Sequence, residues 1–92
     1  MHERRMTRQI QVGGVPVTPA ELAYHWDAAR NVDRAIPAWI DAGLAAERIY
    51  AFADARRAFE RALELGPEAE GIDWSEVLHR AADCALLTGD YK

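Results

Sequence analysis

The sequence predicts an all-α fold of four helices that form antiparallel pairs, with a short β-hairpin before the first helix. Two capping boxes, apolar residues at helical spacing and a Gly66-Pro67 helix end support this prediction. The 92 residues are enough for one small domain, which we divide into a basic N-terminal arm over 1–17 and a helical domain over 18–92. With 18 alanines and eight aromatic residues, the core is expected to be thin and built by close helix approach.

The hairpin and the first helix are adjacent. Residues 9–17 place short alternating apolar segments on both sides of a Gly-Gly pair, which is typical of a hairpin with a two-residue turn. Thr18 and Glu21 form a capping box around Pro19, which predicts a helix from there to about Arg30. The apolar residues expected on its inner side are Leu22, Trp26 and Ala29.

The second helix is expected to open at residues 31–33 and to extend to about Tyr50. Pro37 falls near its start, so we expect regular helix only from Ile36 onward. Gly43 lies in the middle of this helix, where glycine costs about 1 kcal/mol relative to alanine. Such a glycine predicts a close helix crossing at which any side chain would clash.

The third and fourth helices are expected over 52–65 and from Asp73 to about Thr88-Gly89, with a polar loop between them. Asp73 and Glu76 repeat the capping-box pattern. Helix three has a charged outer face with pairs such as Arg56–Glu60 at i,i+4, which is typical of a solvated surface. The residues of helix four expected to point inward are Trp74, Val77, Leu78, Ala81, Ala82 and Ala85.

Charge and hydropathy exclude several classes of partner. The net charge is −4, yet residues 1–17 carry three arginines and one glutamate, so the helical domain is acidic and we expect no nucleic-acid partner. No apolar run approaches the roughly 20 residues that cross a bilayer, and the N-terminus lacks a secretory segment. A single cysteine fits a reducing compartment. We therefore expect a cytoplasmic protein without a membrane partner.

Side chains that could perform chemistry are few. His79 and Asp83 stand at i,i+4, but no partnered nucleophile accompanies them, so we expect a surface pair rather than a catalytic one. Cys84 lies five residues after His79 and so points to a different helix face; we expect it in the core. The sequence predicts no enzyme activity, no cofactor and no metal site.

Aromatic residues supply the candidate contacts. The large rings are expected to lie mostly in the core: Tyr24, Trp26, Trp39, Tyr50, Phe59 and Trp74. An aromatic residue with a polar tip also suits peptide recognition in a groove. The candidate groove or partner contacts are Tyr24, His25, His79 and Tyr91.

Two helix junctions, over 45–55 and 81–91, are similar at an offset of about 36 residues, close to the 34-residue tetratricopeptide period. Through residues 22–26, 28–38 and 45–65, the chain resembles the helical-repeat region of large LuxR-type ATP-binding bacterial transcriptional regulators and related cyclase-linked ATPases. The resemblance covers about 20–91 and implies a tetratricopeptide-like scaffold for protein contacts or inducer sensing. The family's nucleotide and DNA activities do not carry over, because the chain has neither a phosphate-binding Gly-x-x-x-x-Gly-Lys loop nor a recognisable DNA-reading helix.

Three functions follow as expectations. The first is a non-enzymatic protein–protein interaction module of the tetratricopeptide type, with a protein or peptide partner. The alternative is a ligand-sensing fragment of a bacterial transcriptional regulator, which predicts an apolar pocket between the first two helices. A small enzyme is third, and needs a cleft that joins His79 to a second polar group. Since stacked repeats need about three units or a cap, the open face of helix four predicts a homodimer.

Overall fold

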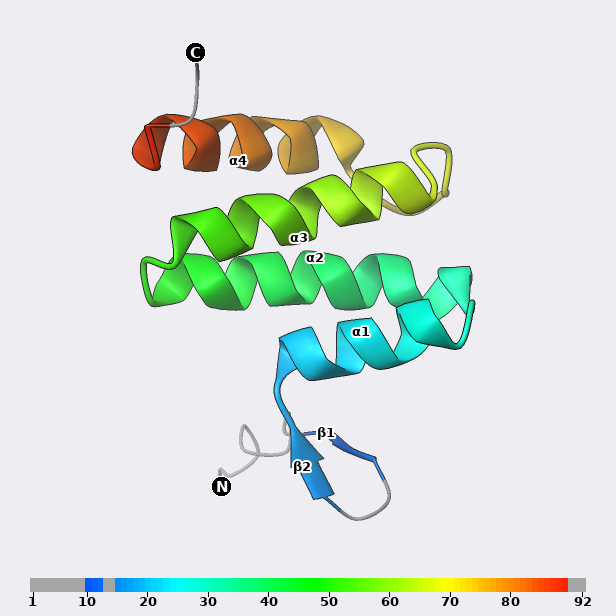
Figure 1. The fold of residues 1–92 in the computed structure, drawn as a ribbon. Helices are drawn as coiled ribbons and strands as arrows, with labels where there is room; N and C mark the ends of the chain where they lie inside the picture. The colour runs from blue at the N-terminus through cyan, green and yellow to red at the C-terminus, as the bar shows by residue number, and fades with distance from the viewer. Residues whose placement is uncertain (1–9, 13–14, 90–92) are drawn as a thin grey trace, which may run out of the picture.

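A computed structural model of the chain describes residues 10–12 and 15–89 (Figure 1). Four helices fill most of this part, α1 (Pro19–Ala28), α2 (Val32–Arg48), α3 (Phe52–Leu65) and α4 (Trp74–Leu87), after two short strands, β1 (Ile10–Val12) and β2 (Val15–Val17). The all-α prediction is confirmed. The basic residues of the arm, the Gly-Gly turn and Tyr91 lie outside the described residues.

The helices stack in chain order, and each runs antiparallel to the one before it (Figure 1). Helix α1 packs on α2, α2 on α3, and α3 on α4, so α1 and α4 are the two outer helices of the stack. The strands pair antiparallel, with Ile10 opposite Val17 and Val12 opposite Val15, as the predicted hairpin requires. Strand β2 leads through Thr18 directly into α1.

The helix starts follow the predicted caps, with one exception. At α1 the capping box is complete, because Thr18 Oγ1 accepts from the Glu21 amide and Glu21 Oε1 accepts from the Thr18 amide, both at 3.1 Å. At α4 only half of it forms. Asp73 accepts from the Glu76 amide at 3.2 Å, but the Glu76 carboxylate accepts instead from Arg80 Nε at 2.7 Å, one turn further along the helix.

Helix α2 begins earlier than predicted. It is regular from Val32, with Asn31 Oδ1 accepting from the Arg34 amide at 3.3 Å, and Pro37 lies inside it. The expectation of regular helix only from Ile36 is therefore wrong. A proline at this depth removes one amide donor, which the capped first turn and the packing of α2 tolerate.

Three helices end in the same way. Arg30 after α1 and Tyr50 after α2 both have φ of 62°, and Gly89 after α4 has φ of 75°. The amide of each bonds back to a carbonyl in the last turn, and the next residue after Arg30 and after Tyr50 closes the six-to-one bond of a Schellman motif. Tyr50 and Gly89 are 39 residues apart. The predicted offset of about 36 residues therefore does not match these helix ends.

The core is thin, as predicted, and divides into two clusters. One joins α1, α2 and α3 around Trp39, and the other joins α3 and α4 around Phe59 and Cys84. Alanines make up eight of the thirteen buried apolar residues described. In α1 the fully buried residue is Ala23, whereas Ala29, expected on the inner side, is exposed.

Gly43 lies where α2 crosses α3, against the ring of Phe59. A Cβ atom added there would come within 2.5 Å of the ring of Phe59, which has no exposed surface. Real side chains do not approach this closely, so only glycine fits against this ring. The predicted close crossing is confirmed.

Candidate interaction surface

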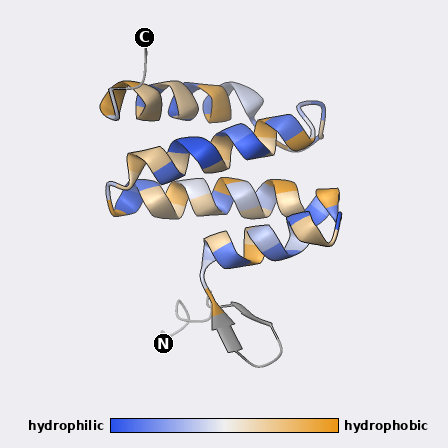
Figure 2. Cartoon of the chain, viewed as in Figure 1, coloured by the Kyte–Doolittle hydropathy of each residue, from blue (hydrophilic) through white to orange (hydrophobic). Residues whose placement is uncertain are grey.

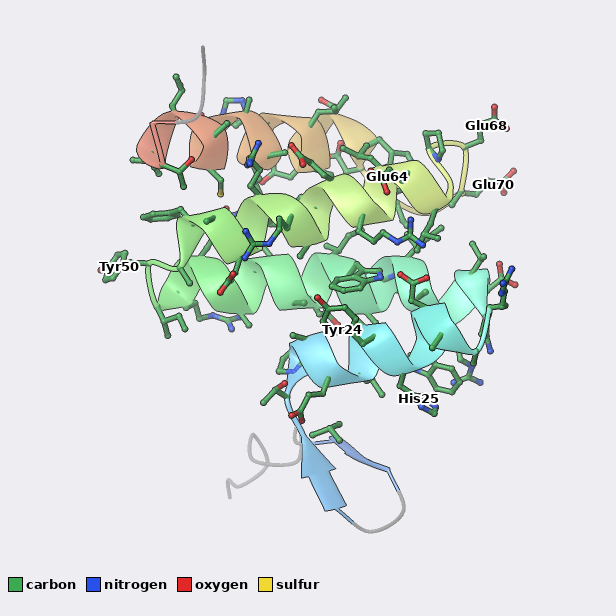
Figure 3. The ribbon with its side chains drawn as sticks, viewed as in Figure 1. Tyr24, His25, Tyr50, Glu64, Glu68 and Glu70 are labelled. Carbon is green, nitrogen blue, oxygen red and sulfur yellow. The ribbon has the colours of Figure 1, made fainter. Side chains whose placement is uncertain are left out.

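The predicted contact residues do not converge on one site. Tyr24 is 66% exposed and stands edge-on to the Trp39 ring, with centroids 4.8 Å apart. His25 packs instead against the Trp26 ring of its own helix, and Figure 3 shows it on the other side of α1 from Tyr24. His79 lies on α4, and Tyr91 lies outside the described residues. Helix α1 thus presents Tyr24 and His25 to different surroundings.

His79 and Asp83 form the predicted surface pair. The His79 Nε2 atom lies 3.3 Å from Asp83 Oδ2, and both side chains are more than half exposed. Within residues 10–12 and 15–89, no group of three or more His, Cys, Asp or Glu side chains could hold a metal ion. No helix of that same part combines the length and the apolar character needed to cross a membrane.

A polar cluster links α1, α2 and α3. Asp27 accepts two hydrogen bonds from Arg61, at 2.7 and 2.9 Å, and a third from the indole Nε1 of Trp39 at 2.9 Å. The Asp27 side chain is 18% exposed. Hydrogen bonds from the Arg61 guanidinium hold the pKa of the Asp27 carboxyl below its usual value, because they favour the charged form.

A second polar contact, between Glu47 and Arg80, links α2 to α4. Glu47 accepts a hydrogen bond from Arg80 and lies 3.7 Å from the Cys84 sulfur. The two clamps, Asp27–Arg61 and Glu47–Arg80, each join a helix to the next but one along the chain. The stack is therefore held by contacts between alternate helices as well as between neighbours.

Cys84 is 1% exposed, as expected of a core cysteine. Burial raises the pKa of its thiol to about 11, and the nearby Glu47 carboxylate adds to the effect. The thiolate is the reactive form of cysteine, so this thiol is poorly suited to nucleophilic chemistry.

A hollow opens beside the α1–α2 turn. It has a volume of about 500 Å³, and its lining is half polar: Asp27, Ala28, Arg30, Asn31, Val32, Ala35, Arg61 and Leu65. The ion pair of Asp27 and Arg61 forms part of its wall. This hollow is more polar than the apolar pocket that a ligand-sensing fragment predicts between the first two helices.

The largest difference from the sequence prediction lies on α4. Val77, Ala81 and Cys84 face the core, but Leu78 is 56% and Leu86 60% exposed. Together with Ala82 and Ala85 they form an apolar strip at i, i+4, i+7 and i+8, and Figure 2 shows hydrophobic colour along α4 to its end. We call these four residues the outer face of α4. The expectation that Leu78 and Ala82 point inward is wrong, because the apolar arc of α4 is wider than α3 alone covers.

A smaller apolar spot lies at the α2–α3 turn. Ile49 is 73% and Tyr50 79% exposed, and Figure 3 shows Tyr50 pointing away from the stack. The expectation of Tyr50 in the core is wrong. Tyr50 occupies the left-handed position that ends α2, its φ of 62° being uncommon for any residue but glycine, and its ring lies 6.0 Å from that of Phe52.

In comparisons with known proteins, no family model, no curated protein and no solved structure matches the chain.

The Asp27 cluster makes stability depend on pH. Because the folded-state pKa of Asp27 lies below the unfolded value of about 3.9, its stabilisation is complete above that value and is lost as the pH falls through the folded pKa. We expect Asp27→Asn to lower the free energy of unfolding by about 1–2 kcal/mol at pH 7. The difference from wild type should narrow below about pH 4.

Urea unfolding at pH 7 and at a series of lower pH values measures the difference in free energy of unfolding between wild type and Asp27→Asn. Glu70→Gln is the matched control, because Glu70 is an exposed carboxylate on the loop between α3 and α4 (Figure 3). If Asp27→Asn lowers the free energy of unfolding by the same amount from pH 7 to pH 2, the pKa of Asp27 is not lowered in the folded state.

Proposed function

We propose that this chain is a non-enzymatic protein–protein interaction module of the tetratricopeptide type that self-associates through the outer face of α4. The observation that carries the proposal is the exposure of two leucines, Leu78 and Leu86, on the last helix of the stack. Ala82 and Ala85 continue the same strip, so the face contains no charged side chain. Covering it buries no charge, and each Å² of apolar surface removed from water contributes roughly 25 cal/mol.

The arrangement of helices supports a module of stacked helix pairs. Neighbouring helices are antiparallel, and the clamps Asp27–Arg61 and Glu47–Arg80 tie alternate helices together. In such stacks each unit covers the apolar face of the one before it, and the outer face of α4 is an apolar face that α3 does not cover. Resemblance to the repeat region of LuxR-type regulators is consistent with this role.

The alternative, a ligand-sensing fragment, finds less support. Its predicted site is an apolar pocket, and the hollow beside the α1–α2 turn is half polar. The Arg61 guanidinium in its wall is already bound to Asp27 and Glu64, so it is not available for a ligand without the loss of those bonds. The outer face of α4, by contrast, needs no rearrangement to bind.

Sedimentation of two single variants tests the proposal. Leu86→Glu places a charge in the outer face and should raise the dimer dissociation constant at least 100-fold. Leu87→Glu is the matched control: Leu87 is 62% exposed on the same helix but lies outside that face, so its dissociation constant should stay within threefold of wild type. Equal effects of the two substitutions would contradict the proposed surface.

A further inference from the structure

We infer that two copies of the chain exchange helices, so that α3 and α4 of each copy pack on α1 and α2 of the other. The hinge is the turn over 49–51, between α2 and α3. This exchange goes beyond the proposed function and does not depend on the outer face of α4. It follows from the residues of the turn, from its backbone conformation and from the contacts between the two sides of the hinge.

The turn over 49–51 lacks the residues that stop a helix at the other two connections. All three connections between the helices lie within the described part of the chain. Asn31 caps α2 after the first connection, and the last contains Gly66-Pro67 and the Asp73 cap. The middle connection reads Ile-Tyr-Ala, and Ala51 makes no side-chain hydrogen bond to the first turn of α3. The local sequence therefore also fits a continuous helix from α2 into α3.

The closed turn requires an unfavourable backbone conformation at Tyr50. Its φ of 62° lies in the left-handed region, where a Cβ atom crowds the backbone. The side chain is 79% exposed, so packing in the core does not fix it there. With Tyr50 in the right-handed region, α2 and α3 become one helix over 32–65 and no longer pack on each other. Short hinge loops under strain favour exchange between copies for this reason.

A second copy restores the contacts that the opened chain loses. Both core clusters contain residues from each side of the hinge. Two ion pairs also join the two sides, Asp27–Arg61 and Glu47–Arg80. In the exchanged dimer each of these contacts forms between copies, with the same residues in the same surroundings. Such an exchange is a low-cost route to a dimer, and the occupant of each surface is the one that the structure already shows on it.

Refolding from urea at high protein concentration tests the exchange. Opening the hinge breaks both core clusters, so the exchanged dimer should form during refolding and persist after dilution. The background is Leu86→Glu, in which association through α4 is removed. Size-exclusion chromatography after dilution should then show a dimer that refolding at a hundredfold lower concentration does not give.

Two glycine variants in the same background test the hinge. Tyr50→Gly should lower the fraction of refolded dimer at least fivefold, because glycine adopts the left-handed conformation readily and disfavours the continuous helix. Arg30→Gly is the matched control. Arg30 has the same φ of 62° after α1, but Asn31 caps the helix that follows, so the dimer fraction should stay within twofold. Equal dimer fractions for the two variants would overturn the hinge at 49–51.

Charge reversal identifies the exchanged halves. Chains with Asp27→Arg and chains with Arg61→Asp each bring like charges together when they fold alone. In an exchanged dimer of the two, one half pairs the two substituted residues and the other half pairs the two native ones. Opposite charges then meet in both halves, so a refolded mixture in the Leu86→Glu background should give at least tenfold more mixed dimer than either dimer of identical chains.

The outcomes separate the helix exchange from the proposed contact through α4. No dimer after concentrated refolding, or a dimer without preference for the mixed pair, would overturn the exchange and leave the α4 contact standing. A refolded dimer with the mixed preference, together with a wild-type chain that is monomeric at every concentration before refolding, would support the exchange and overturn the α4 contact alone.

Discussion

Replacement of Phe59 by alanine should lower the free energy of unfolding by about 3–5 kcal/mol, the usual cost of removing a fully buried aromatic ring. Phe59 has no exposed surface and is the largest fully buried side chain described. It forms the centre of the cluster that attaches α4 to α3. The free energy of unfolding of a domain is about 5–15 kcal/mol in total, so this loss is a large fraction of it.

Chemical unfolding followed by circular dichroism measures this effect. Tyr50→Ala is the control, since it also removes an aromatic ring but from a side chain that is 79% exposed. Its free energy of unfolding should stay within about 0.5 kcal/mol of wild type. Equal losses for the two substitutions would mean that Phe59 does not hold the two halves of the stack together.

The second large effect is expected at Gly43, where two principles predict opposite signs. Helix propensity alone predicts that Gly43→Ala stabilises the protein by about 1 kcal/mol. The new Cβ atom, however, would lie 2.5 Å from the buried Phe59 ring, and overpacking of this kind costs about 1–3 kcal/mol. We expect the clash to win, with a net loss of up to about 2 kcal/mol in the free energy of unfolding.

Thermal and urea unfolding of a double-mutant cycle with Phe59→Leu separate the two contributions. The smaller leucine gives the methyl group space, so Gly43→Ala should cost less in the Phe59→Leu background than in wild type. A stabilised Gly43→Ala variant, or a cost that is independent of residue 59, would contradict the close crossing of α2 and α3.

Local signals in the sequence predicted the helices well, because their determinants lie within one or two turns of chain. The capping box at Thr18 and the cap at Asp73 act between residues three apart, and the structure has both helices start there. Gly43 also predicted the close approach of another helix, because a glycine within a helix lowers helix stability and is otherwise unfavourable there. These features need no knowledge of which helix packs on which.

Contacts between distant residues could not be predicted from spacing. Asp27 binds Trp39, 12 residues away, and Arg61, 34 residues away, and no short-range pattern relates these positions. The prediction that Leu78 points inward was wrong for a related reason. The apolar residues of α4 cover more than half of the helix circumference, and only the packed structure determines which of them face α3 and which remain exposed.

The positions of the candidate contact residues could not be predicted from residue type alone either. Tyr24 and His25 are neighbours in sequence, but consecutive helix residues point about 100° apart, so one packs on Trp39 and the other on Trp26. Tyr50 was expected in the core because it is aromatic, yet its left-handed backbone position at a helix end directs it outward. Residue type indicated the chemistry of these side chains, and backbone geometry determined where they lie.

The solution molar mass of the wild-type chain shows whether the protein self-associates through α4. Light scattering over a hundredfold range of concentration should give a mass near twice the 10.3 kDa of one chain at the upper end. The mass should fall toward that of one chain for Leu86→Glu. A wild-type mass of 10.3 kDa throughout the range would mean that the chain does not self-associate.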